Sequence, residues 1–468
     1  MAVQDTFFFS SEVAKKTALK SRRFNNGYHL QLCFYCGDKL DLDYDLINLI
    51  HLPIDNIVSI LESGKYRIPT LLSFEGVNLP QNKMKHIAGI INTQLELSKA
   101  KRDINILKYS KLIKSNTLDF REPLRFFLLA HSETKVMSKV SSNIVDKLKE
   151  MNCDIRFSLD HGCFEYEHLI TMSNFNPHIV ININHINNRY LNDNSFNFVW
   201  IQDFFALEQF KTAQIRKNDY FFTLLKVFEE EVSKYNIEYE RQSFCINDNI
   251  FKLDSSIKRE KKIVFVGSSY SSHIDGKYEE VLSELIPFFL SGKTFTSKYI
   301  DEIGKKYKIA SKFIEEQLVH FIVRDVSVIQ LCSMSNDIDY EIEIYGRGWE
   351  QYDEVLPFFK GELNYGEDIS KVYNSAELAF CPHPLSVLQQ RTLEAAGSGA
   401  VPIMYDCRDL TDEKYYEEAI HYFKSIDSLK ELLTKKVLDT KNYELLLKEN
   451  SYENFIHKII TKVKKEKQ

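Results

Sequence analysis

Several features that would place the chain in a familiar class are missing from its sequence. No apolar run approaches the roughly 20 residues that a membrane-spanning helix needs. The first residues, MAVQDTFFFSSEVAKK, lack the basic segment and the long apolar core of a signal peptide. The net charge of −6 over 468 residues gives no reason to expect nucleic acid as a partner. We therefore expect a soluble, cytoplasmic protein.

Cysteine is sparse and scattered along the chain. Of eight cysteines, only Cys33 and Cys36 have the spacing of metal ligands, and no second CxxC pair or histidine pair completes a zinc site. Reduced, mostly buried thiols are the favoured interpretation. The Asp-x-Asp triplet Asp41-Leu42-Asp43, a potential metal-binding motif, lies within residues 1–118 and does not stand in a convincing context. We expect neither a metal nor a cofactor.

Residues 1–118 carry few strand patterns. Segments such as 55–62 and 84–112 instead space Ile, Leu and Val as a helix does. We predict a mainly helical extension here. It serves either as a cap on the next domain or as a surface for acceptor docking or homo-oligomerisation.

From residue 123 the pattern changes to apolar strands alternating with helices, which predicts a parallel sheet covered on both faces. Polar residues follow these strands. They are His131 after LRFFLLA, the Asp160-His161 pair after CDIRFSL, and Asp203 after FNFVWIQ. Because the carboxyl ends of parallel strands share one edge of a sheet, these residues are candidate catalytic groups. Each of them also has a structural interpretation, such as capping the next helix.

A charged segment, DSSIKREKK, reads as a linker to a second sheet. The strand KKIVFV runs into Gly267, Ser268 and Ser269, whose small side chains permit close approach of a ligand to the backbone. The loop is not a G-x-G-x-x-G fingerprint, which disfavours nicotinamide or flavin binding. A later strand, DYEIEIY, ends at Gly346, Arg347 and Gly348.

The segment 374–405 predicts strand, loop, helix, turn and strand. Its loop, CPHPLS, is broken by prolines and contains His383, and Arg391 and Glu394 follow on nearly the same helical face. A carboxylate there can accept hydrogen bonds from a ribose diol, and an arginine can neutralise phosphate. The alternative is a plain helix-surface ion pair.

Two motifs together resemble the signature of the GT-B glycosyltransferases of the "glycosyl transferases group 1" type, nearest to their spore-maturation-protein-like branch. The first is Arg391, Glu394 and Ala395 followed by the Gly397 and Gly399 turn. The second is Tyr345–Trp349, which reads Tyr-Gly-x-Gly-Trp. The resemblance does not cover residues 1–118.

The resemblance implies an α/β fold of two Rossmann-like, doubly wound parallel-sheet domains facing a cleft. We expect an acceptor-side domain at 119–255, a nucleotide-sugar domain at 256–445, and a helix at 446–468 that crosses back to the acceptor side. The donor wall would comprise Gly267, Ser268, Ser269, Gly346, Arg347, His383, Arg391 and Glu394. The acceptor wall would carry His131, Asp160, His161 and Asp203, one of which would deprotonate the acceptor if the enzyme inverts.

The leading hypothesis is thus a metal-independent glycosyltransferase that moves a sugar from a nucleotide-sugar donor to a glycan or protein acceptor. One alternative is a sugar-nucleotide epimerase of similar fold. Another is a non-catalytic nucleotide-binding or interaction protein, with residues 1–118 as an interaction module on a degenerate scaffold of the same fold. A phosphorylase is disfavoured because no lysine motif suits pyridoxal phosphate. The basic tail, IHKIITKVKKEKQ, can contact an anionic membrane or form a solvated helix end. The base, the sugar, the acceptor and the stereochemistry stay open.

Overall fold

A computed structural model describes the chain in two compact units. The first comprises Met1–Phe222, Tyr235–Tyr239 and Thr461–Gln468, and the second comprises Thr223–Lys234 and Glu240–Ile460. The finer domain boundaries predicted above stay predictions. The described residues are 6–8, 33–35, 49–51, 54–63, 65–66, 68–69, 71–74, 79–121, 123–130, 135–159, 165–271, 274, 276–408, 416, 418–434 and 443–467.

The described part of residues 1–118 is mainly helical, as predicted, but it also holds a sheet that the spacing did not indicate. Four strands of three residues pair in the order β3-β2-β1-β4, and the pairs are parallel. Such short strands leave no period-two pattern in the sequence, which is why they were missed. The elements are β1 (Thr6–Phe8), β2 (Cys33–Tyr35), β3 (Leu49–His51), η1 (Ile54–Asn56), α3 (Ile57–Glu62), β4 (Leu71–Ser73) and α4 (Gln81–Ser115).

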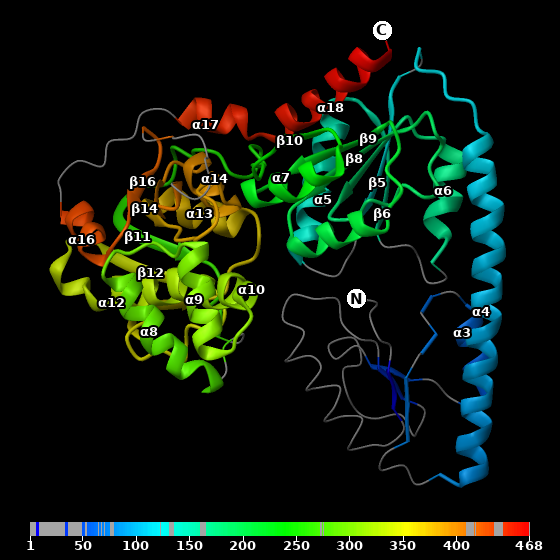
Figure 1. Cartoon of the computed structure of the whole chain (residues 1–468), viewed down its shortest axis with the longest axis horizontal. Helices are drawn as coiled ribbons and strands as arrows, with labels where there is room; N and C mark the ends of the chain where they lie inside the picture. The colour runs from blue at the N-terminus through cyan, green and yellow to red at the C-terminus, as the bar shows by residue number, and fades with distance from the viewer. Residues whose placement is uncertain are drawn as a thin grey trace. The chain divides into compact units, whose positions relative to one another are not determined.

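Helix α4 is the longest helix among the described residues, and it spans most of the height of Figure 1 as a single blue-to-cyan rod. Pro80 precedes its first turn, where a missing N–H costs nothing. Its amino-terminal half buries Ile87 and Ile91 against Ile57 and Leu61 of α3. Its carboxyl-terminal half packs against α6 (Glu167–Phe175).

The first unit carries a six-stranded sheet in the order β10-β9-β8-β7-β5-β6. From β5 the chain steps outward to β6 and then back across β5 to β7. Because crossovers are right-handed, the reversal puts α5 and α6 on opposite faces, as the prediction of a doubly wound sheet requires. The elements of residues 125–241 are β5 (Arg125–Ala130), α5 (Lys135–Glu150), β6 (Asp154–Leu159), β7 (Ile179–Ile183), β8 (Phe196–Ile201), η2 (Phe204–Lys211), β9 (Asp219–Thr223), α7 (Lys226–Val232), η3 (Ser233–Tyr235) and β10 (Tyr239–Arg241). Of these, α7 and parts of β9, η3 and β10 belong to the second unit.

The second unit carries another six-stranded parallel sheet, in the order β13-β12-β11-β14-β15-β16. The strand order reverses between β11 and β14, which is the switch point where open α/β sheets bind ligands. The prediction of two doubly wound sheets is therefore confirmed (Figure 1). The strands are β11 (Glu260–Val266), β12 (Glu341–Tyr345), β13 (Phe359–Gly361), β14 (Ala376–Phe380), β15 (Val401–Tyr405) and β16 (His421–Phe423).

Between β11 and β12 the chain forms a long helical run that twice departs from the α-helical hydrogen-bond pattern. Two five-residue π-helical segments, η6 and η7, interrupt it, and such segments often occur at functional sites. The run comprises α10 (Ser311–Phe313), η6 (Ile314–Leu318), α11 (Val319–Phe321), η7 (Ile322–Val326) and α12 (Ser327–Ser333). The other helices from residue 276 on are η5 (Gly276–Tyr278), α8 (Glu279–Leu290), α9 (Ser297–Tyr307), η8 (Ser335–Asp337), η9 (Leu356–Phe358), α13 (Glu367–Ser375), α14 (Gln390–Gly397), α16 (Ile426–Thr434), α17 (Tyr443–Glu449) and α18 (Tyr452–Lys467). Helix α18 belongs to the second unit up to Ile460 and to the first unit from Thr461.

The cysteines that the structure describes outside β2 are free thiols, as expected. Cys245, Cys332, Cys381 and Cys407 are buried and Cys153 is partly buried. Burial raises the pKa of Cys332 and of Cys381 to about 12, so these thiols stay protonated. Among the described helices none is long and apolar enough to cross a bilayer.

Candidate functional site

The loops that follow β11 and β12 are joined by backbone hydrogen bonds at the carboxyl edge of the second sheet. Gly267 N donates to Tyr345 O at 2.9 Å, and Ser269 N donates to Arg347 O at 2.8 Å. The indole of Trp349, which is fully buried, donates from Nε1 to Gly267 O at 2.7 Å. The Tyr-Gly-x-Gly-Trp motif therefore holds the small-residue loop after β11 in one conformation.

Gly346 is the position where this arrangement demands glycine. Its φ is +130°, and a Cβ there would lie 2.1 Å from Gly267 O. No side chain fits into that space. The neighbouring Arg347, predicted to bind the donor, instead places Nε 3.0 Å from Glu362 Oε2. A carboxylate thus already offsets its charge.

Glu394 and Arg391 lie on α14, directly after the loop at the end of β14. The Glu394 side chain is 1% exposed and Arg391 Nη1 contacts its Oε2, so the two residues share one helical face and form the ion pair that was the alternative to donor binding. Gln390 donates from Nε2 to Glu394 Oε1 at 2.8 Å and to the Tyr365 hydroxyl at 3.2 Å. The Arg391 side chain remains 35% exposed and is accessible to a ligand.

Burial raises the pKa of Glu394 above its ordinary value, while the positive charge of Arg391 and the hydrogen bonds oppose that shift. The carboxylate accepts from Gln390 at Oε1 and from Arg391 at Oε2, and a hydrogen bond with Tyr365 also favours its charged form. A carboxylate offers about four acceptor positions, so the group can still accept a hydrogen bond from a ligand hydroxyl.

The sequence analysis missed a cluster contributed by the π-helical segment η7. Asp325, fully buried, accepts from Ser269 Oγ at 2.5 Å and from Tyr270 N at 3.1 Å. The Tyr352 hydroxyl donates to Asp325 Oδ2 at 3.3 Å. Burial raises the pKa of Asp325, and these donors oppose the rise. Asp325 thus anchors the loop after β11 from the helical side.

Arg324, the preceding residue, points its guanidinium at the same loop. Its Nη1 lies 3.4 Å from Ser268 O, and its Cζ lies 4.1 Å from the centre of the Tyr270 ring. Its buried Nε has no hydrogen-bond partner among the residues that the structure describes. A buried donor without a partner costs free energy, so a ligand oxygen is a natural complement to it.

His383, predicted in the loop after β14, lies against His320 of α11, with ring centres 5.1 Å apart. The backbone N of Leu385 donates to His383 Nδ1 at 3.2 Å, which leaves the proton of a neutral ring on Nε2. Burial, with His320 and Arg324 nearby, holds the pKa of His383 well below its usual value. Burial lowers the pKa of His320 to about 4. Both rings are neutral near pH 7.

In the first unit, only one of the four predicted catalytic residues lies among the described residues. His131, Asp160 and His161 fall outside them. Asp203 precedes η2 but makes no side-chain cap. Instead its Oδ2 accepts from Asn184 Nδ2 at 2.5 Å, and Asn184 Oδ1 accepts from the backbone N of Asp203 at 3.0 Å. Desolvation raises the pKa of Asp203, partly opposed by the Asn184 hydrogen bond.

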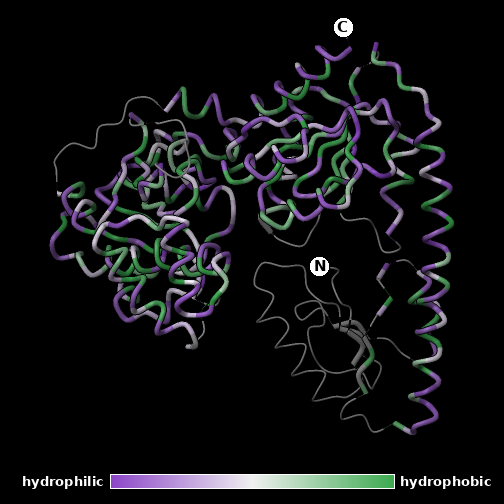
Figure 2. Tube along the Cα trace, viewed as in Figure 1, coloured by the Kyte–Doolittle hydropathy of each residue, from purple (hydrophilic) through white to green (hydrophobic). Residues whose placement is uncertain are grey.

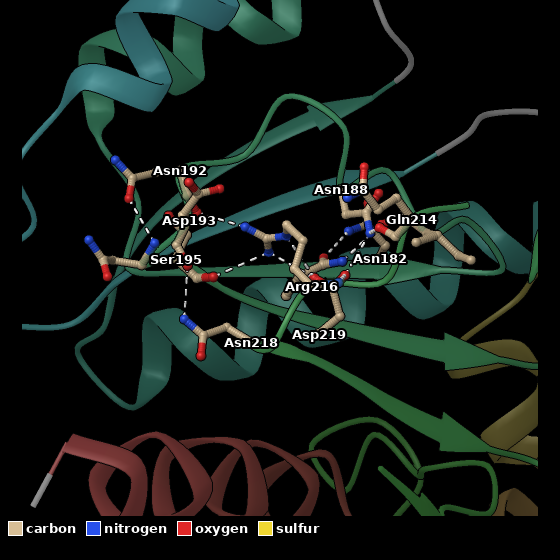
Figure 3. Close-up of polar contacts among 12 residues, drawn as sticks. Asn182, Asn188, Asn192, Asp193, Ser195, Gln214, Arg216, Asn218 and Asp219 are labelled. Carbon is tan, nitrogen blue, oxygen red and sulfur yellow. Dashed lines mark hydrogen bonds and ion pairs between the residues drawn. The ribbon is translucent and has the colours of Figure 1, made fainter. Parts of the chain in front are cut away.

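A second polar cluster of the first unit surrounds Arg216, as Figure 3 shows. Its guanidinium donates to Asp219 Oδ1 at 2.8 Å and to the carbonyls of Asn192 and Ser195 at 2.7 and 3.2 Å. Asn188 Nδ2 donates to the other Asp219 oxygen at 2.6 Å. These bonds hold the β7–β8 connection to the start of β9. A cavity of about 840 Å³ lies beside them, with a largely apolar floor from Leu129, Leu169 and Met172 and further polar groups from the connection.

Metal ligation finds no support among the described residues, where no three His, Cys, Asp or Glu side chains cluster as ligands. The CxxC pair cannot be assessed, because Cys36 and the side chain of Cys33 are not described. Metal independence stays a prediction.

Comparison with known proteins gives a similarity in architecture. No protein-family model and no curated protein matches the chain. Solved structures do match. One is AviGT4, a glycosyltransferase involved in avilamycin A biosynthesis, at 9% identity over 73% of this chain and 97% of that chain, with a TM-score of 0.43.

Two further matches are of the same kind. Sucrose-phosphate synthase from Thermosynechococcus elongatus is 9% identical over 73% of this chain and 98% of that chain, with a TM-score of 0.44. WaaG, a glycosyltransferase involved in lipopolysaccharide biosynthesis, is 12% identical over 71% and 95%, with a TM-score of 0.39. At such scores the likeness carries no conclusion about activity, which has to come from the residues of the site.

Proposed function

We propose that the chain is a glycosyltransferase whose second unit binds a nucleotide-sugar donor. The observation that carries this proposal is the environment of Glu394. A buried carboxylate, oriented by Gln390 and Arg391, follows the switch-point strand β14 of a doubly wound sheet. A ribose hydroxyl is suited to such an acceptor because it can donate to a carboxylate oxygen.

The diphosphate would lie against the loop after β11. Two guanidinium groups are available for it, Arg324 with its unpartnered buried Nε and Arg391 with its accessible side chain. Arg347 is a third candidate, and its Nε contacts Glu362 as Arg391 contacts Glu394. Arginine suits this task since its planar donors match phosphate oxygens, and it stabilises the leaving group without a metal.

The reaction joins an acceptor hydroxyl oxygen to the anomeric carbon of the sugar while the bond from that carbon to the diphosphate oxygen breaks. The diphosphate leaves with the bonding electrons. The acceptor proton passes to a carboxylate or imidazole if the configuration inverts, or to the leaving phosphate oxygen if it is retained. Asp203, with its raised pKa and its hydrogen bond to Asn184, supports the first route, with His131, Asp160 and His161 as further candidates.

Isothermal titration with UDP, GDP, CMP, ADP and dTDP, with and without EDTA, tests the donor class. One of these nucleotides is expected to bind and to do so equally with EDTA. Glu394→Gln should weaken that nucleotide at least about tenfold, because one charged acceptor of a ribose hydrogen bond is worth roughly 1.5–3 kcal/mol.

Glu343→Gln is the matched control. Glu343 is 8% exposed and lies 3.1 Å from Lys262, but it belongs to the interior of β12 rather than to the strand-end loops. It should leave nucleotide affinity unchanged. Equal losses in the two variants, or no binding by folded wild-type protein, would leave the non-catalytic interpretation. Conversion of a nucleotide sugar without transfer to any acceptor would favour an epimerase.

A further inference from the structure

The outer face of α4 exposes large apolar side chains in a regular row. Leu97, Ile104 and Leu107 are 56%, 66% and 72% exposed. Steps of seven and three residues turn an α-helix by only about 20° and 60° from full turns, so the three side chains lie on one side of the helix. Figure 2 shows green segments recurring among purple ones along this helix.

Each of these apolar residues is followed four positions later by an exposed lysine. The lysines are Lys101, Lys108 and Lys111, and they lie on the same face. We call these six residues the α4 stripe. Residues 97–115 contain six basic residues and one acidic residue, although the whole chain has a net charge of −6. Positive charge is thus concentrated where apolar side chains meet solvent.

Contacts on the opposite face keep the stripe turned outward. Ile113 is buried, and Tyr109 stacks on Tyr166 with ring centres 6.4 Å apart. Arg102 Nη1 lies 2.9 Å from Glu165 Oε2. Asn192 Nδ2 donates to the carbonyl of Ile113 at 3.1 Å, which fixes the carboxyl end of the helix to the first unit. Rotation of the helix is therefore restrained within that unit.

We propose that the α4 stripe docks on a lipid bilayer that carries anionic headgroups. Apolar side chains can enter the headgroup and acyl boundary while the lysines reach the phosphate groups above it. The alternation argues against nucleic acid, which attracts lysine but offers no site for leucine on its phosphate backbone. It also argues against a second copy of the helix, because the lysines of two facing stripes would repel each other. The inference is independent of the proposed activity.

Flotation of the full-length protein with vesicles tests the proposal, using phosphatidylcholine alone and phosphatidylcholine mixed with phosphatidylglycerol. Binding is expected to the mixed vesicles only, and to weaken at high salt, because salt screens the lysines. Lys108→Gln/Lys111→Gln should lower the partition coefficient roughly thirty-fold, since each lysine near an anionic surface contributes about 1 kcal/mol. Ile104→Ser/Leu107→Ser should lower it at least about tenfold.

Two matched controls locate the effect. Lys464→Gln/Lys465→Gln removes the same charge from exposed residues of the C-terminal tail, and Leu253→Ser removes an apolar side chain that is 65% exposed in the second unit. Both should bind vesicles as the wild type does. Failure to bind anionic vesicles would overturn the proposal, as would binding that only the tail variant loses. A dimer that Ile104→Ser/Leu107→Ser disrupts, or RNA binding equal to vesicle binding, would overturn it too.

Discussion

Gly346→Ala offers a sharp test of how the strand-end loops are held. The substitution adds one methyl group to a residue with φ of +130°, and that carbon would lie 2.1 Å from Gly267 O. The backbone of Gly267 would have to move. Its carbonyl accepts the Trp349 indole N–H at 2.7 Å, and its N–H donates to Tyr345 O at 2.9 Å, so both bonds would be disturbed.

Gly361→Ala separates the two causes of destabilisation. Gly361 has φ of +95°, but a Cβ there meets nothing within 4 Å, so only backbone strain is added. Strain of this kind costs about 1–3 kcal/mol. Gly346→Ala adds the loss of a buried hydrogen bond, about 1–3 kcal/mol more. We expect the free energy of unfolding to fall by at least about 2 kcal/mol more for Gly346→Ala than for Gly361→Ala.

The two tryptophans of the chain make the assay specific to the second unit. Trp200 belongs to β8 of the first unit and Trp349 to the second. In a Trp200→Phe background, urea unfolding followed by fluorescence therefore reports the environment of Trp349. Nucleotide affinity should fall in Gly346→Ala and survive in Gly361→Ala. Equal destabilisation by both alanines would refute the claim that contact with Gly267 dictates the glycine.

Three further predictions follow from burial, charge and backbone geometry. Asp203→Asn should lower kcat about 10²–10⁴-fold without changing donor affinity, and an unchanged kcat would exclude Asp203 as the base. Because the base must be ionised and its pKa is raised, the wild-type rate should begin to fall at a pH above the usual aspartate pKa. The pKa of His320 falls from 6.5 to about 4 on folding, so the unfolded chain binds more protons between these values and stability should decline as the pH drops from 6.5 toward 4. Burial lowers the pKa of His383 in the same direction, so urea titrations at pH 7 and pH 5 compare the wild type with His320→Gln/His383→Gln, and an equal decline in the double variant would contradict the prediction. Gly89 lies inside α4, and a Cβ added there would meet nothing within 4 Å, so Gly89→Ala should stabilise the first unit by about 0.5–1 kcal/mol. Urea unfolding in a Trp349→Phe background measures this, and a loss of stability would contradict the open environment of Gly89.

The predicted site residues separate by the kind of information that each one needed. Glu394 and Arg391 are three positions apart on one helix, so helical geometry alone predicted their pairing. Gly346 and Trp349 were visible as a motif, but their function of positioning Gly267 depends on β11 and β12 being neighbours. Arg347 stays a predicted donor contact, and its 3.0 Å contact with Glu362, which follows β13, is one that the sequence did not indicate.

Arg324 and Asp325 could not be recognised from the sequence. They lie in a long charged helical stretch with no motif around them, more than 50 residues from the loop that they contact. The one signal that the sequence offered for these residues was polar side chains at positions that the helical pattern predicts to be buried. Asn184 was hidden in the same way, because its hydrogen bonds to Asp203 cross from β7 to β8.

The sequence by itself determined the alternation of strands and helices, the polar and glycine residues at the strand ends, and the apolar and basic face of α4. These properties depend on residues within a few positions of one another, where the helical and strand periods are set by local geometry. Only the tertiary structure decided which strand ends meet. Parallel strands pair through long crossovers, so β11 lies between β12 and β14, whose starts follow its own by some 80 and 116 residues. That pairing brings Gly267, Gly346 and Asp325 to one site, and no local pattern specifies it.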